Sequence, residues 1–90
     1  MFGEDIDELI GTITEKATEH RLIVWNDEVN TFHWVILCFI DILKWDWIQS
    51  EQAALIIHYN GKCEVKRGEW DSLKVFKDAL IDRGLNVTIE

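Results

Sequence analysis

The feature that most constrains the fold is a five-residue run, RLIVW, at positions 21–25. The run is short, β-branched and apolar, and polar and apolar residues do not alternate along it. This pattern predicts a central strand, because both faces of such a strand must be covered. Two later segments, KCEVKR at 62–67 and LNVTIE at 85–90, alternate as strands with one wet face do. We therefore expect a small three-stranded sheet.

Three segments with helical character separate these strands. Apolar residues recur at helical spacing over 32–43, which predicts the first helix. Ser50 is the predicted start of a second helix, and Gly61 is its predicted stop. A third helix is expected over about 69–83. The order β-α-α-β-α-β predicts an α/β (α+β) fold: one small domain whose three-stranded sheet is covered by helices.

The first 20 residues differ from the rest of the chain in charge. They contain six acidic residues and one lysine, a formal net charge of −5 out of −8 for all 90 residues. We expect 1–20 to be a mobile acidic N-terminal extension and 21–90 to be the globular domain. The acidic balance argues against a nucleic-acid partner, which requires basic patches. A cationic group, such as a free amine, suits this charge better.

Other classes of function find little support in the sequence. Cys38 and Cys63 lack the spacing of a metal or redox motif, and no metal site or cofactor is expected. His58 and Cys63 do not form a convincing catalytic pair, so we do not expect an enzyme. The apolar run over 34–40 is too short to span a membrane, and the acidic first residues do not resemble a signal peptide. The expected location is the cytoplasm.

A polar cluster at 26–30, NDEVN, stands between the first strand and the first helix. One interpretation is helix capping, because carboxylates and amides suit the exposed N–H groups at a helix start. His58, in the last turn of the second helix, has a similar structural interpretation as a side chain that suits the negative pole of that helix. These residues taken separately do not decide between capping and binding.

Taken together, ND-E-x-N-T-F, EQAALIIHYNGK and GLNVTIE resemble the ClpS family of adaptors of bacterial Clp proteases, from about Arg21 to Glu90. The resemblance implies that the protein binds the free N-terminal residue (Leu, Phe, Tyr or Trp) of N-degron proteins. It also implies that the protein delivers them to the N-terminal domain of a Clp AAA+ unfoldase, as a non-enzymatic step of the N-end rule pathway of protein degradation. The implied ligands of the substrate α-amine are Asn26, Asp27 and His58, with Glu28 and Asn30 supporting the rim. The implied hydrophobic pocket consists of Phe32, Val35, Ala54, Ile57 and Leu85.

This implied site is chemically sensible. An α-amine with a pKa of about 8 is mostly a cation at neutral pH and needs acceptors in a negative field. An amide oxygen, a carboxylate and a neutral imidazole nitrogen are suitable acceptors. An acetylated terminus lacks the charge and would leave those acceptors unpaired. The polar cluster is thus interpreted as an amine clamp, and the apolar helix that follows as the wall of the pocket.

The sequence departs from the family pattern at three positions. The family commonly has Met where this chain has Phe32, a larger residue where it has Ala54, and Thr where it has Asn30. The resemblance further implies an unfoldase-docking surface that includes Lys62, Asp71 and Lys74. Two alternatives stay open from the sequence: a Clp-docking module without N-terminal recognition, and a small structural or stalk-type α/β domain. Neither alternative needs Asn26, Asp27 and His58 together.

Overall fold

The computed structural model describes residues 19–90, so the predicted acidic extension lies outside the described residues except for its last two positions. The elements run in the order β1 (His20–Trp25), α2 (Phe32–Cys38), η1 (Phe39–Leu43), α3 (Trp47–Asn60), β2 (Lys62–Gly68), α4 (Trp70–Asp82) and β3 (Asn86–Ile89). This is the predicted order, with five π-helical residues, η1, continuing the first helix. The fold is a small α+β domain.

The sheet has the strand order β2-β1-β3, and both pairs are antiparallel. The prediction that 21–25 forms the central strand is therefore confirmed. Leu22 and Val24 are almost completely buried, and Ile23 on the opposite side of the strand is 5% exposed. The register with β2 shifts between Leu22 and Ile23, which leaves Val65 as an extra residue in a β-bulge.

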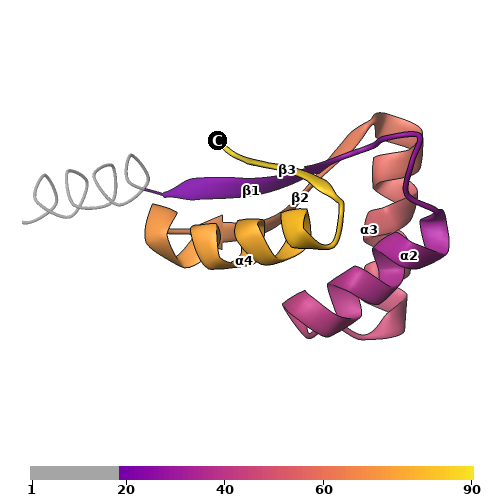
Figure 1. The fold of residues 1–90 in the computed structure, drawn as a ribbon, viewed down its shortest axis with the longest axis horizontal. Helices are drawn as coiled ribbons and strands as arrows, with labels where there is room; N and C mark the ends of the chain where they lie inside the picture. Colours follow the sequence, from indigo (N-terminus) through magenta and orange to yellow (C-terminus); the bar gives the residue numbers. More distant parts are fainter. Residues whose placement is uncertain (1–18) are drawn as a thin grey trace, which may run out of the picture.

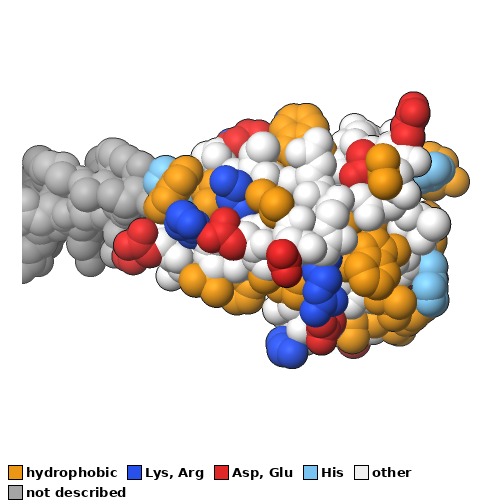
Figure 2. Space-filling model, in the orientation of Figure 1, with side chains coloured by type: hydrophobic (Ala, Val, Ile, Leu, Met, Phe, Trp, Pro, Cys, Tyr) orange, Lys and Arg blue, Asp and Glu red, His pale blue; other side chains and the backbone are white. Residues whose placement is uncertain are grey.

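Helix α4 covers one face of the sheet, whereas α2 and α3 lie together at the end where β1 stops (Figure 1). The main core lies between α4, the sheet and these two helices, and it includes Leu22, Phe39, Leu73, Leu80 and Val87. Hydrophobic side chains are also exposed over the α2–α3 end of the molecule (Figure 2), where more than a third of the surface of Trp34, Leu37 and Trp47 remains accessible.

The predicted start of the second helix, with Ser50 as its cap, is wrong by four residues. Asp46, not Ser50, is the N-cap of α3, and its side chain accepts a hydrogen bond from the backbone N–H of Gln49 at 2.7 Å. Both residue types favour the N-cap position, so residue type alone does not decide between them. Ser50 lies fully buried in the first turn, where its hydroxyl donates to the carbonyl of Asp46 at 2.8 Å.

Over residues 19–90, the structure contains no helix that is long and apolar enough to cross a membrane.

Candidate functional site

A pocket with a volume of about 340 Å³ opens where β1 ends, between α2 and α3. Its lining combines three kinds of side chain: amides and carboxylates from the loop after β1, apolar groups from the two helices, and one imidazole. The lining residues are Asn26, Asp27, Glu28, Asn30, Phe32, Val35, Ala54, Ile57 and His58. Residues separated by up to 32 positions in the chain thus meet around one cavity.

A backbone hydrogen bond links the end of β1 to the end of α3 at the polar side of this pocket. The backbone N–H of Asn26 donates to the carbonyl of Gly61 at 2.8 Å. Gly61 ends α3 in a left-handed conformation (φ 90°), and its own N–H donates to the carbonyl of Ile57 at 2.9 Å. The exposed side chains of Asn26 and His58 therefore come from two chain segments that are fixed relative to one another.

The carboxylate of Asp27 organises the loop between β1 and α2. Its Oδ1 accepts from the backbone N–H of Val29 at 3.0 Å and of Asn30 at 2.8 Å. Its Oδ2 accepts from Nδ2 of Asn30 at 2.8 Å. Partial burial raises the pKa of Asp27, but these hydrogen bonds outweigh it, and the pKa lies below its ordinary value. Asp27 therefore carries a negative charge at neutral pH, held in one orientation.

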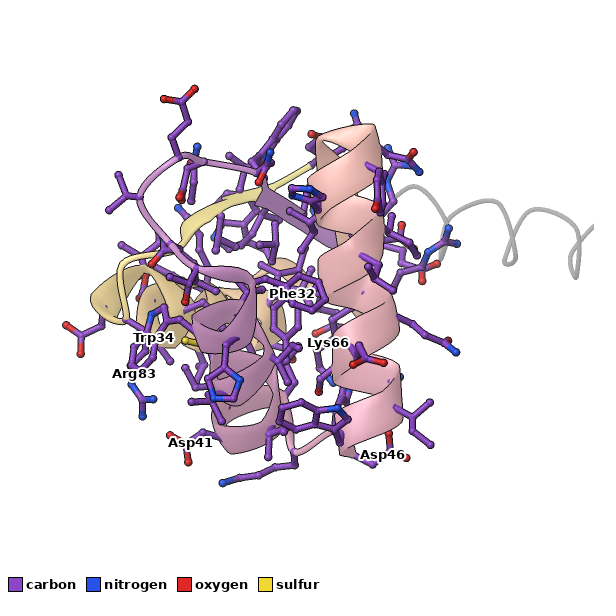
Figure 3. The ribbon with its side chains drawn as sticks, turned by 90° about the vertical axis from the view of Figure 1, so that its right-hand side faces the viewer. Phe32, Trp34, Asp41, Asp46, Lys66 and Arg83 are labelled. Atoms are coloured by element: carbon purple, nitrogen blue, oxygen red, sulfur yellow. The ribbon has the colours of Figure 1, made fainter. Side chains whose placement is uncertain are left out.

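Helix α2 forms one wall of the pocket, beginning at Phe32. Thr31 is its N-cap, and the threonine hydroxyl accepts from the backbone N–H of Trp34 at 3.1 Å. Asn30 is also a suitable cap residue by type, but the structure has Thr31 in this position. Phe32 is 39% exposed and lies between α2 and α3 (Figure 3).

The floor of the pocket is apolar. Ala54 and Ile57, from the buried side of α3, are each 3% exposed, and Val35 of α2 is half-buried. The small Ala54 side chain leaves room between the helices. Leu85, which the resemblance also places in the pocket, is not among the lining residues; it is 5% exposed and belongs to the main core.

The electrostatics of the pocket favour a cation. Among residues 19–90, the side chains that line it include the carboxylates of Asp27 and Glu28 and no lysine or arginine. His58 lies in the last turn of α3, where the unpaired carbonyls of the helix end add negative potential. The arrangement therefore has the chemistry to accept hydrogen bonds from a cationic group while an attached apolar group is buried beneath it.

The residues expected to dock on an unfoldase lie outside the pocket. Lys62 opens β2, and its Nζ lies 4.9 Å from the ring centroid of Trp25. Asp71 is in the first turn of α4. Lys74, also on α4, pairs with Asp78 at 2.8 Å. All three are exposed.

The two cysteines have structural surroundings. Cys38 is fully buried in the core, and Cys63 is half-buried on β2. Burial raises the pKa of both thiols, with nearby charges as smaller causes, so neither is activated as a thiolate. The described residues contain no group of three or more His, Cys, Asp or Glu side chains placed to hold a metal ion.

Two backbone carbonyls that shape the site, those of Gly61 and Gly84, are absent from the sequence-based predictions. Gly61 accepts from the N–H of Asn26, and Gly84 accepts from Nδ2 of Asn30 at 2.8 Å. Glycine is a common residue type at helix ends, and Gly61 is the predicted stop of the second helix. The sequence does not say which distant group the two glycine carbonyls meet, because tertiary packing decides that.

The structure is that of a small α+β domain with a pocket whose lining suits a group that is cationic at one end and apolar at the other. The family model described as "ATP-dependent Clp protease adaptor protein ClpS" matches residues 15–88. The ATP-dependent Clp protease adapter protein ClpS of Corynebacterium aurimucosum is 30% identical over 94 aligned residues, which cover 100% of this chain and 83% of that protein. The chain belongs to the ClpS family of ATP-dependent Clp protease adaptors.

The fold is also that of a solved member of this family. The structure of Agrobacterium tumefaciens ClpS2 bound to L-phenylalaninamide superposes with a TM-score of 0.78, covering 81% of this chain and 95% of that one at 16% identity. This superposition confirms the predicted fold, and the family model and the Corynebacterium aurimucosum relative confirm the family resemblance. Family membership also confirms that the protein is a non-catalytic adaptor in protein degradation.

Proposed function

We propose that the pocket binds the free N-terminal residue of proteins marked for degradation, with Leu, Phe, Tyr or Trp as that residue. In this proposal the α-amine lies among the side chains of Asn26, Asp27 and His58. The first side chain enters the apolar part formed by Phe32 and the floor of α3. The single observation that carries the proposal is the meeting of these polar and apolar groups in one cavity of about 340 Å³.

The energetics support a requirement for both halves of the ligand. A hydrogen bond to a charged group contributes about 1.5–3 kcal/mol. Burying a Leu or Phe side chain contributes roughly 1.5–3 kcal/mol. An internal peptide segment has no α-ammonium group, so the acceptors of the site would lose water without gaining a cation. A. tumefaciens ClpS2, which has a similar fold, binds L-phenylalaninamide in its solved structure. This ligand has a free amine and an aromatic side chain.

We further propose that the adaptor passes bound proteins to the N-terminal domain of a Clp AAA+ unfoldase in the cytoplasm. Lys62, Asp71 and Lys74 are the proposed contact residues, because they are exposed and lie away from the pocket. Docking and substrate binding would then occupy separate surfaces. In the same proposal, residues 1–20 form an extension to the adaptor domain of 21–90.

The test is a calorimetric titration with a peptide that begins with Phe and with the same peptide acetylated at its N-terminus. The free peptide is expected to bind and the acetylated one is not. Equal affinity for both peptides would contradict recognition of the amine. Binding of neither peptide, with retained binding to the unfoldase domain, would instead identify a docking module that does not read N-termini.

A further inference from the structure

The side chain of Asn30 connects the proposed amine site to the C-terminal end of helix α4. Nδ2 of Asn30 donates to Oδ2 of Asp27 and to the carbonyl oxygen of Gly84, each at 2.8 Å. A primary amide has two N–H donors, and both are used here. Asn30 therefore joins a residue three positions away to one 54 positions away.

The same contacts determine where the Asp27 carboxylate points. An ionised carboxylate offers about four acceptor positions. Asp27 uses three of them, for the N–H groups of Val29 and Asn30 and for the Asn30 amide. About one position is left for a water molecule or an ammonium group. Rotation of the carboxylate would break these hydrogen bonds, so the loop fixes the direction of the remaining acceptor.

The carbonyl of Gly84, which accepts the hydrogen bond from Asn30, has a fixed position at the end of α4. It ends α4 in a left-handed conformation (φ 91°), and its N–H donates to the carbonyl of Ile81 at 2.8 Å. The preceding carbonyl, of Arg83, accepts from Nε1 of Trp34 on α2 at 3.0 Å. Two successive carbonyls at the C-terminal end of α4 thus hold the loop and the helix that wall the pocket, and Figure 3 shows Trp34 beside Arg83.

We propose that Asn30 is a positioning residue of the amine site: its side-chain amide fastens the Asp27 carboxylate to the α4–β3 turn and so keeps the acceptor directed at the bound ammonium group. This inference rests on the proposed function. The role needs two donors on one short side chain. Alanine has neither, serine has one hydroxyl donor, and aspartate would place a second carboxylate against both Asp27 and a carbonyl oxygen.

The test compares Asn30→Ala with Trp34→Phe, using the free and acetylated Phe peptides. Trp34→Phe is the matched control, because it removes the neighbouring link to α4 without altering a lining residue. Asn30→Ala is expected to weaken binding of the free peptide about tenfold, since the orientation of one charge-assisted acceptor is lost. Trp34→Phe is expected to leave the affinity unchanged. Equal losses of affinity in both variants would overturn the proposal, because Asn30 would then act only through loop stability.

A second measurement follows the carboxyl carbon of Asp27 by NMR as the pH falls, in the protein without peptide. Asn30→Ala is expected to move its midpoint to higher pH, because a hydrogen bond to the charged form is removed. Glu28 from the same loop and His58 from α3 also line the pocket, and Arg83 at the end of α4 pairs with Asp41. These groups are present in both proteins, so the difference between the two titrations reports on Asn30.

The NMR measurement separates failure of this inference from failure of the proposed function. If the parent protein binds no peptide, the proposed function fails, while the Asp27 titration still shows whether Asn30 holds the carboxylate. An unchanged Asp27 midpoint in Asn30→Ala would overturn the inference whatever the peptide result. If Asn30→Ala does not fold, Asn30→Ser takes its place, with an intermediate shift expected and no shift counting against the inference.

Discussion

The backbone N–H of Asn26 donates to the carbonyl of Gly61 at 2.8 Å, and this one hydrogen bond joins the two chain segments that carry the polar half of the pocket. Asn26 is the first residue after β1, and Gly61 is the C-cap of the helix that carries His58. The bond can form because Gly61 turns the chain out of α3 immediately after its last helical residue. The relative placement of Asn26 and His58 thus depends on a left-handed glycine.

Replacement of Gly61 is therefore expected to affect both stability and binding. An added Cβ at Gly61 would meet no atom within 4 Å, so the cost comes from the backbone conformation (φ 90°) and not from crowding. We expect Gly61→Ala to lower the free energy of unfolding by about 1 kcal/mol. Gly61→Asn is the matched control, because asparagine tolerates this conformation better, and it should lose less stability. Urea unfolding measures both changes, and an Asn variant that is less stable than the Ala variant would contradict the conformational explanation.

Truncation of the proposed amine ligands should change affinity far more than stability. The side chains of Asn26 and His58 are exposed, so Asn26→Ala and His58→Ala leave no cavity in the core. Each is expected to weaken binding of a free Phe peptide by about 1.5–3 kcal/mol, which is roughly ten- to more than hundredfold. Calorimetry on both variants, with thermal unfolding as the control, makes this comparison. Unchanged affinity in His58→Ala would favour the interpretation of His58 as a helix-end residue only.

Acid should weaken the link between η1 and the end of α4. Arg83 donates to the carboxylate of Asp41 in an exposed ion pair (Figure 3). This hydrogen bond and the charge of Arg83 lower the pKa of Asp41. A carboxylate whose pKa is lowered by folding stabilises the protein above its unfolded pKa, about 3.9, and that stabilisation is lost as the pH falls through the lower folded value.

The expected result is that Asp41→Asn is less stable than the parent protein at pH 7 and that the difference disappears below the pKa of Asp41. Thermal unfolding from pH 7 to pH 2 measures this difference. High salt provides the control, because it screens an exposed ion pair and should reduce the difference at pH 7. A difference that persists at pH 2 would show that the substitution acts through something other than the charge of Asp41.

The sequence predicts the fold well where the patterning is local. The apolar run at 21–25 has no wet face, and it forms the central strand. The start of α3 could not be predicted to the residue, because Asp46 and Ser50 are both good N-cap types, and only the path of the chain shows which one caps. The π-helical turn at Phe39–Leu43 could not be predicted either, because its side chains continue the apolar pattern of the helix before it.

The candidate site could not be predicted from local patterning alone. The residue types at 26–30 and His58 allowed both capping and binding, and only the resemblance to a family brought them together. In the structure these residues line one cavity, whereas Leu85 lies in the main core and not in the pocket lining. The link from Asn30 to Gly84 could not be predicted, because it depends on a contact between residues 54 positions apart. Patterning indicates which side of an element is buried, whereas the partners of individual polar groups depend on how elements pack.

The aromatic ring of Phe32 provides the last prediction, which concerns the choice of first residue. Phe32 begins α2 at the mouth of the pocket and is 39% exposed, so its ring is free to contact a ligand. Aromatic pairs contribute about 0.5–1.5 kcal/mol beyond the area that they bury. We therefore expect the parent protein to favour a peptide that begins with Phe over one that begins with Leu.

Phe32→Leu keeps an apolar side chain at this position but removes the ring. It should weaken binding of the Phe peptide by about 1 kcal/mol, roughly fivefold, relative to its effect on the Leu peptide. Four titrations, with two proteins and two peptides, isolate this coupling from any general change in the pocket. Equal losses for the two peptides would mean that Phe32 acts only as an apolar wall.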